Sequence, residues 1–185
     1  MTRRLVLICL LASALTAAAE PSGFRTIEAN GQSLAFRESG TGDAVILIHG
    51  SNADMRAWQG QLAALAPHYR AITYSRRYHP PNPVPDGAPD ASVTAQADDL
   101  AALIEGLGAG PAHLVAQSFG GAVALEVARR RPDLVRSLTL AEPPLSGLVA
   151  DESAVAERRA LRAELDAAFA SGDAELIVRT YGARV

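Results

Sequence analysis

Apolar and polar positions follow two different patterns near the start of this chain. Over residues 24–28 and 34–37 they alternate with a period of two, which is typical of strands with one exposed face. Asn30-Gly31 separates these segments and is a strong signal for a tight hairpin turn. Residues 44–48 are apolar without interruption. Such a run indicates a strand covered on both faces, as in a parallel sheet.

Predicted helices and strands then alternate along the chain. Apolar residues at helical spacing predict helices over residues 55–66, 92–107 and 121–130. Short apolar runs predict strands over residues 69–74, 113–116 and 135–141. Helical spacing returns from residue 153 onward, with a break at Gly172-Asp173. A hairpin followed by this alternation predicts a doubly wound, mostly parallel α/β sheet of about six strands.

The first 19 residues are typical of an export signal. Arg3 and Arg4 precede an apolar run over residues 5–15, and Ala17-Ala18-Ala19 forms a small-residue cleavage site. We expect cleavage before Glu20 and a periplasmic or secreted protein, by the twin-arginine or the general secretory route. The membrane is then contacted only through the signal, or through this segment as an uncleaved anchor.

Composition narrows the function classes. The net charge of −3 gives no reason to expect a nucleic-acid partner. The single cysteine, Cys9, lies in the signal, so the mature chain has no thiolate for a metal site. No glycine-rich phosphate motif follows a predicted strand, which argues against a nucleotide binder of the same sheet type. We therefore expect no cofactor and no metal.

One stretch carries the strongest candidate chemistry. Ala116-Gln117-Ser118-Phe119-Gly120-Gly121 follows a predicted strand and precedes a predicted helix. A sharp strand-to-helix turn needs small residues at its flanks, and Ala116 and Gly120 satisfy that need. Such a turn holds a serine hydroxyl at the carboxyl end of the strand, beside the N–H groups of a helix N-terminus. Ser118 is therefore a candidate nucleophile.

This turn, together with three other segments, resembles the α/β-hydrolase family over roughly residues 24–144. The other segments are His49-Gly50 after the buried strand, residues 55–58, and Glu142-Pro143-Pro144 after the last predicted strand. The turn departs from the usual G-x-S-x-G only at its first position, where alanine is also small. After the signal over residues 1–19, the resemblance implies a hydrolase core over 20–147 and the incomplete start of a helical lid over 148–185.

The resemblance also implies roles for individual residues. Ser118 corresponds to a nucleophile that forms an acyl-enzyme with a small-molecule ester, thioester or lactone. The backbone N–H groups of Phe119 and Ser51 correspond to the oxyanion donors, and the Asn52 side chain could add a contact. A serine at this position argues against the branches that use an aspartate nucleophile, the haloalkane dehalogenases and epoxide hydrolases.

The catalytic base and acid are harder to assign. The family order is serine, then acid, then histidine, and no histidine follows Ser118. His79 follows a strand at the catalytic edge and could contact substrate or act as a replacement base. Glu142 is the only acid at a strand end after the turn, so it is a candidate acid or a pocket residue.

The other titratable residues have structural interpretations. His49 is expected to hold its own loop by hydrogen bonds, and His68 and His113 lie at the wrong edge of the predicted sheet. The acids expected to be solvated are Asp98, Asp99 and Asp133.

Two hypotheses follow. In the first, the chain is part of a longer exported serine hydrolase whose acid and base lie beyond residue 185. In the second, the chain is complete and is a non-catalytic binding module, or an enzyme of very low activity. The first is favoured, because the sequence stops within a helical pattern.

Overall fold

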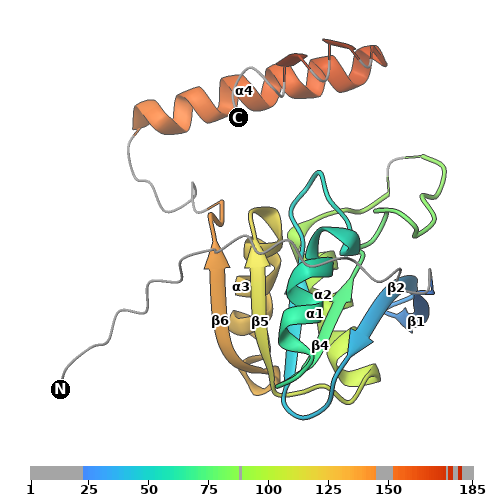
Figure 1. Ribbon diagram of the computed structural model, residues 1–185. Coiled ribbons are helices and arrows are strands. Elements are labelled where there is room, and N and C mark those ends of the chain that lie inside the picture. The colour runs from blue at the N-terminus through green and yellow to red at the C-terminus, as the bar shows by residue number, and fades with distance from the viewer. Residues whose placement is uncertain (1–22, 88, 145–151, 174, 177–178, 181–185) are drawn as a thin grey trace.

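The computed structural model describes residues 23–87, 89–144, 152–173, 175–176 and 179–180 of the 185-residue chain. Its strands and helices confirm the predicted alternation (Figure 1). In chain order the elements are β1 (Arg25–Ala29), β2 (Gln32–Ser39), β3 (Ala44–Ile48), the 3-10 helix η1 (Met55–Trp58), α1 (Gln59–Leu65), β4 (Arg70–Tyr74), α2 (Val93–Gly106), β5 (Ala112–Gln117), α3 (Phe119–Arg130), the 3-10 helix η2 (Pro132–Leu134), β6 (Val135–Ala141) and α4 (Glu152–Ser171).

Six described strands form one sheet in the order β1-β2-β4-β3-β5-β6. β1, β2 and β4 pair antiparallel, whereas β4, β3, β5 and β6 are parallel to one another. The β1–β2 hairpin turns at Asn30 and Gly31, both of which have positive φ (51° and 72°). Asn-Gly tolerates that conformation, so the expected hairpin forms. The predicted fold class is confirmed.

Helices cover both faces of the sheet, as a doubly wound fold requires. Figure 1 shows α1 in front of the strands and α2 and α3 behind them. The predicted apolar face of α2 is buried, because Leu100, Leu103 and Ile104 are fully excluded from solvent. They pack with Ile46 of β3 and Leu114 of β5 in the main core.

Two predicted helices differ from the observed ones. The helix expected over residues 55–66 is divided into η1 and α1, with Trp58 (φ −103°, ψ 11°) outside helical geometry at the junction. The helix expected from residue 121 begins earlier, at Phe119. Its start moves because Ser118 turns the chain within one residue, so the helix follows the strand directly.

The prediction that Asp99 is solvated is wrong. Asp99 is 1% exposed and its carboxylate accepts two hydrogen bonds of 2.6 Å from the Arg77 guanidinium. Asn30 of the hairpin turn donates to the same carboxylate at 2.9 Å. Spacing alone placed Asp99 on a polar helix face, whereas the loop after β4 folds over that face and buries it. Asp98 and Asp133 are exposed, as expected.

The C-terminal part contains the long helix α4, drawn beyond the carboxyl ends of the strands in Figure 1. It ends before Gly172, whose φ of +69° breaks the helix as predicted. The signal segment 1–19 and the core–lid boundary near residue 147 lie outside the described residues. None of the described helices is long and apolar enough to cross a membrane.

Candidate active site

Three loops leave the sheet at one edge. Ile48 of β3 is in register with Tyr74 of β4 on one side and with Ala116 of β5 on the other. Because these strands are parallel, the residues that follow them emerge together at the carboxyl edge. This brings residues 49–52, 75–79 and Ser118 to the same side of the sheet.

Ser118 has a backbone conformation that is rare for a residue with a side chain. Its φ is 50° and its ψ is −126°, between the end of β5 and the first residue of α3. Its N–H donates to the carbonyl of Ala141 at 2.9 Å, and its own carbonyl accepts from Gly121 at 2.8 Å. These bonds hold the turn in a strained geometry, which is characteristic of functional sites.

The turn is tight enough to require glycine two residues later. A β-carbon at Gly120 would lie 2.6 Å from the carbonyl oxygen of His49 and 2.7 Å from that of Ile48. The start of α3 is therefore pressed against the end of β3. A β-carbon at Gly50 would likewise lie 3.2 Å from the β-carbon of Ser118. The loop after β3 thus borders the Ser118 side chain.

Two backbone N–H groups near Ser118 are free. Phe119 is the first residue of α3, where a helix has no carbonyl to accept from its N–H. Ser51 follows Gly50 in the adjacent loop. Within the described residues, neither N–H donates to a protein acceptor. Both can therefore donate to a bound group.

His49 is a neutral structural residue in this arrangement. Its Nε2 accepts the backbone N–H of Arg76 at 3.0 Å, so its Nδ1 carries the proton and donates to the Gly50 carbonyl at 2.8 Å. Burial, with the nearby Arg76 charge, lowers the pKa of His49 from 6.5 to about 3. Because both nitrogens are engaged, His49 supports the loop as predicted and has no lone pair free for Ser118.

His79 also binds the surrounding backbone. Its Nε2 lies 3.0 Å from the Ser51 carbonyl and 3.2 Å from the Arg76 guanidinium, and its Nδ1 lies 2.9 Å from the Arg77 carbonyl. Its ring contacts that of His49 edge-on, with centroids 4.8 Å apart. In the described part of the chain, no histidine or carboxylate hydrogen-bonds the Ser118 hydroxyl. No described contact therefore supports His79 as the base for Ser118.

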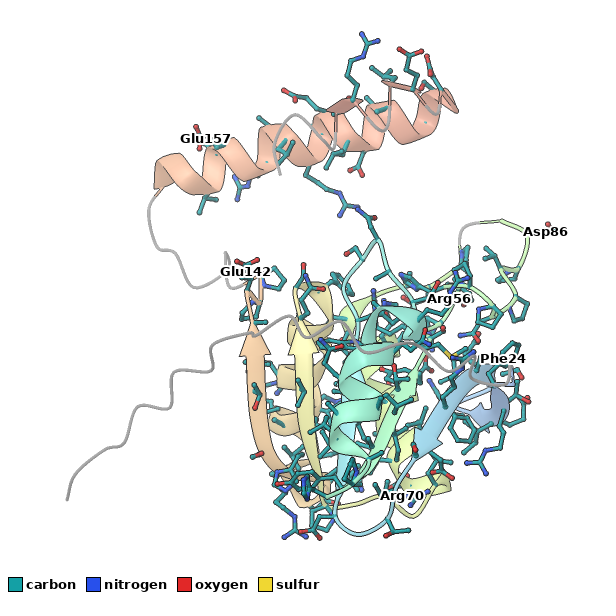
Figure 2. All side chains as sticks on the ribbon, in the orientation of Figure 1. Phe24, Arg56, Arg70, Asp86, Glu142 and Glu157 are labelled. Carbon is teal, nitrogen blue, oxygen red and sulfur yellow. The ribbon has the colours of Figure 1, made fainter. Side chains whose placement is uncertain are left out.

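The remaining candidates fall into two groups. Glu142 directly follows β6, with a positive φ of 50°, and next to it Ala141 binds the N–H of Ser118. Its exposed side chain is labelled at the end of β6 in Figure 2. Asn52 is exposed in the loop after β3. His68 lies in the turn before β4 and His113 at the start of β5, so both are at the opposite edge, as expected.

Sequence reasoning missed Arg76 as a site residue. Its side chain is buried beneath the loop after β3 and contacts His49, Gly50 and His79. The only signal was its position two residues after a buried strand, and an arginine in a loop rich in proline and asparagine is expected to be solvated.

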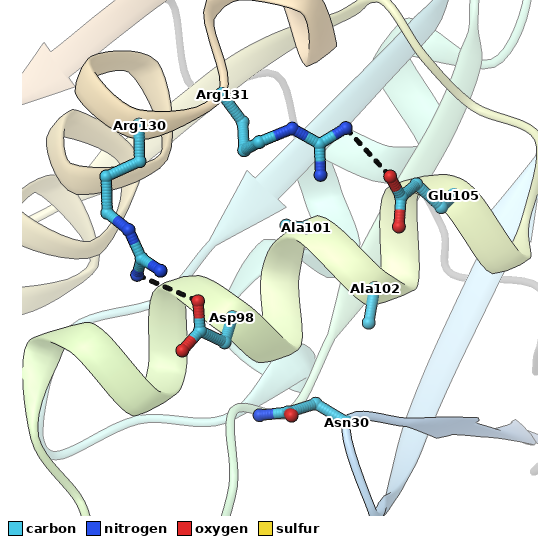
Figure 3. A pocket seen from close by; sticks show the side chains of 7 residues that line it. All are labelled: Asn30, Asp98, Ala101, Ala102, Glu105, Arg130 and Arg131. Carbon is cyan, nitrogen blue, oxygen red and sulfur yellow. Dashed lines mark hydrogen bonds and ion pairs between the residues drawn. The ribbon is translucent and has the colours of Figure 1, made fainter.

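One described cavity lies away from this edge. It has a volume of about 370 Å³ and is lined by α2, the end of α3 and Asn30, with ion pairs Arg130–Asp98 and Arg131–Glu105 across it (Figure 3). No residue of the Ser118 edge lines it, so we assign it no role in the chemistry.

Among the described residues, no three His, Cys, Asp or Glu side chains converge as a metal site would require.

Comparison with known proteins identifies the fold family. Residues 43–176 match the family of the α/β hydrolase fold. The chain belongs to this family. The resemblance drawn from the turn at Ser118 and from the His49-Gly50 loop is thereby confirmed.

Sequence relatives of this α/β-hydrolase chain include one named as a hydrolase and others that are uncharacterized. A protein of Pantoea ananatis with the name "Putative carbamate hydrolase RutD" is 32% identical over 110 residues, which are 56% of this chain and 38% of that protein. An uncharacterized protein of Mycobacterium tuberculosis is 35% identical over 117 residues, 63% of this chain and 33% of its own. The chain thus spans about a third of the length of these relatives.

Solved structures agree. An epoxide hydrolase from Vigna radiata aligns with a TM-score of 0.63 at 28% identity, over 68% of this chain and 39% of that one. A thermophilic esterase from Thermogutta terrifontis aligns with a TM-score of 0.58 at 34% identity, over 64% of this chain and 45% of the esterase.

Proposed function

We propose that this α/β-hydrolase chain carries the nucleophile and oxyanion-binding half of an exported serine hydrolase. Ser118 attacks the carbonyl of a small ester, thioester or lactone, and water then hydrolyses the acyl-enzyme. The observation that carries the proposal is the backbone of Ser118. Ser118 has a positive φ and lies between a buried strand and a helix N-terminus, beside two free N–H groups.

The arrangement suits acyl chemistry in particular. When a nucleophile attacks a carbonyl, the oxygen becomes negatively charged, and preorganised N–H donors stabilise it by a few kcal/mol each. The N–H of Phe119 and that of Ser51 are the donors we assign. The similarity to the thermophilic esterase supports ester chemistry. The similarity to the epoxide hydrolase supports only the fold, and the choice between the two reactions rests on the serine at this turn.

Ser118 needs a base, and we place the base and its acid partner in a part of the protein that this chain does not cover. The relatives are two to three times as long as the matched region, which leaves room for both groups. Glu142 is then a residue at the rim of the site, and His79 a support for the Ser51 loop. The alternative is a non-catalytic binding module that retains the strand-to-helix turn at Ser118.

The test uses the protein encoded by the complete reading frame. We expect a fluorophosphonate probe to label it at Ser118 and p-nitrophenyl acetate to be hydrolysed with an initial burst. Ser118→Ala should abolish both signals, whereas Ser137→Ala, which changes an exposed serine on β6, should preserve them. Equal turnover by the Ser118→Ala variant would overturn the nucleophile, and absence of labelling and turnover in the complete protein would favour the binding module.

A further inference from the structure

Arg76 is a buried cation without a carboxylate partner. It is 2% exposed, and no ion pair to it exists among the described residues. Its neighbour Arg77 is also buried but pairs with Asp99 through two hydrogen bonds of 2.6 Å. Removing a guanidinium from water without an acid nearby is costly. An unpaired charge in this position therefore calls for an explanation other than stability.

The hydrogen bonds of Arg76 converge on the loop beside Ser118. Its Nε donates to the carbonyl of His49 at 3.0 Å and a terminal nitrogen donates to the carbonyl of Gly50 at 2.8 Å. The other terminal nitrogen binds the side-chain oxygen of Gln96. The planar guanidinium thus spans two consecutive peptide carbonyls, a fit that its fixed donor geometry allows and an ammonium lacks.

This contact determines the direction of one amide group. The carbonyl of Gly50 and the N–H of Ser51 belong to the same trans peptide and point in opposite directions. Arg76 and the Nδ1–H of His49 both hold that carbonyl, each at 2.8 Å. The N–H of Ser51 must then point away from Arg76. A β-carbon at Gly50 would lie 3.2 Å from that of Ser118, so this peptide lies next to the nucleophile.

The same guanidinium contacts the second donor residue. Its central carbon lies 5.1 Å from the centroid of the Phe119 ring, a cation–π distance. One side chain therefore contacts both the carbonyl of the Gly50–Ser51 peptide and the ring of Phe119.

We propose that Arg76 is the positioning residue of the oxyanion site: it aims the Ser51 N–H and supports Phe119 while adding positive charge behind both donors. This role rests on the proposed function of Ser118. A carbonyl that accepts a charge-assisted hydrogen bond polarises its peptide and makes the N–H a stronger donor. A carboxylate beside Arg76 would cancel the field that stabilises a developing oxyanion, which explains why Arg76 lacks one.

The charge is retained under working conditions. Burial lowers the pKa of Arg76 from its ordinary value to about 10, which still leaves the group protonated near neutral pH. The groups that face it are two backbone carbonyls, Gln96 and the neutral His49 ring, and the Nε2 of His79 lies 3.2 Å from its terminal nitrogen.

Kinetics of the complete protein test the role, with Arg77→Met as a matched control. We expect Arg76→Met to lower kcat for p-nitrophenyl acetate by about tenfold or more with little change in KM, since the lost contribution acts on the transition state. Arg76→Lys should recover part of the loss, because it keeps the charge but not the double contact. Arg77→Met, which leaves Asp99 unpaired, should reduce stability more than Arg76→Met while keeping kcat near the wild-type value.

The outcomes separate this inference from the proposed function. If Ser118→Ala abolishes turnover but Arg76→Met retains the wild-type kcat, the positioning role is wrong and the nucleophile stands. If Ser118→Ala retains turnover, both are wrong. A second readout does not depend on turnover: the amide resonance of Ser51 in the 15N-labelled complete protein. It should shift in Arg76→Met and stay in place in Arg77→Met, and an unshifted Ser51 resonance in Arg76→Met would contradict the proposal.

Discussion

The backbone conformation of Ser118 lowers the stability of the fold but gives the turn its geometry. Its φ of 50° and ψ of −126° lie in a region that side chains disfavour, at a cost of order 1–3 kcal/mol. We expect Ser118→Gly to be more stable than Ser118→Ala by about 1 kcal/mol, because both lose the hydroxyl but only glycine relaxes the backbone. Urea unfolding of the two variants measures this difference. Equal stabilities would mean that the turn is unstrained.

His49 should make folding stability depend on pH. Its folded pKa of about 3 lies below the unfolded value of 6.5, so protons bind the unfolded chain preferentially as pH falls. The contribution is complete above about pH 6.5 and is lost as pH falls toward 3, by about 1.4 kcal/mol per pH unit. Denaturation at pH 7.5 and 5 measures it. In His49→Gln, which retains a donor and an acceptor, the slope of unfolding free energy against pH should lose this contribution. If the slope is the same as in the wild type, groups other than His49 cause the pH dependence.

At the scale of elements, the contact between α3 and β3 depends on a missing side chain. Gly120→Ala would place a β-carbon 2.6 Å from the His49 carbonyl oxygen, which requires the helix to move off the strand. We expect a loss of about 2 kcal/mol in unfolding free energy, since both clashing atoms are backbone. Gly60→Ala in α1 is the matched control, because nothing lies within 4 Å of its added carbon. It should stabilise the protein by about 0.5–1 kcal/mol, and similar effects of the two changes would contradict the close contact.

The elements themselves were largely predictable from the sequence. β6 agrees residue for residue with the predicted strand, because a short segment in which apolar and polar residues alternate, between Pro132 and Pro143, has few alternatives. The start of α3 was not predictable to the residue. Periodicity reports which side chains share a face, whereas the first turn of this helix is determined by the backbone of Ser118.

At the scale of the whole molecule, Asp99 joins segments that are distant in sequence. Its carboxylate binds Arg77 of the loop after β4 and Asn30 of the β1–β2 turn. We expect Asp99→Ala to lower the unfolding free energy by about 3–5 kcal/mol, because it leaves a buried guanidinium unpaired. Asp98→Ala, which removes an exposed partner of Arg130 on the same helix, should change it by less than about 1 kcal/mol. Thermal and urea unfolding compare them; a small effect of Asp99→Ala would show that the buried pair is dispensable.

The candidate site was predictable in part. Ser118, His49 and the loop that contains Ser51 were found from local strings, because a sharp turn needs small residues in a fixed order. Arg76 and the buried Asp99 were not found. Their roles depend on partners 20 or more residues away, at positions where local spacing indicates only a polar surface.

By itself, the sequence determined the alternation of strands and helices, the family and the identity of the serine at the turn. These follow from hydrophobic period and from residues whose backbone preferences are local. Only the tertiary structure decided which charges are buried, that burial keeps His49 neutral, and that one guanidinium holds the peptide beside Ser118. The physical reason is that burial and hydrogen-bond direction arise between segments, when parallel strands bring their carboxyl ends to one edge.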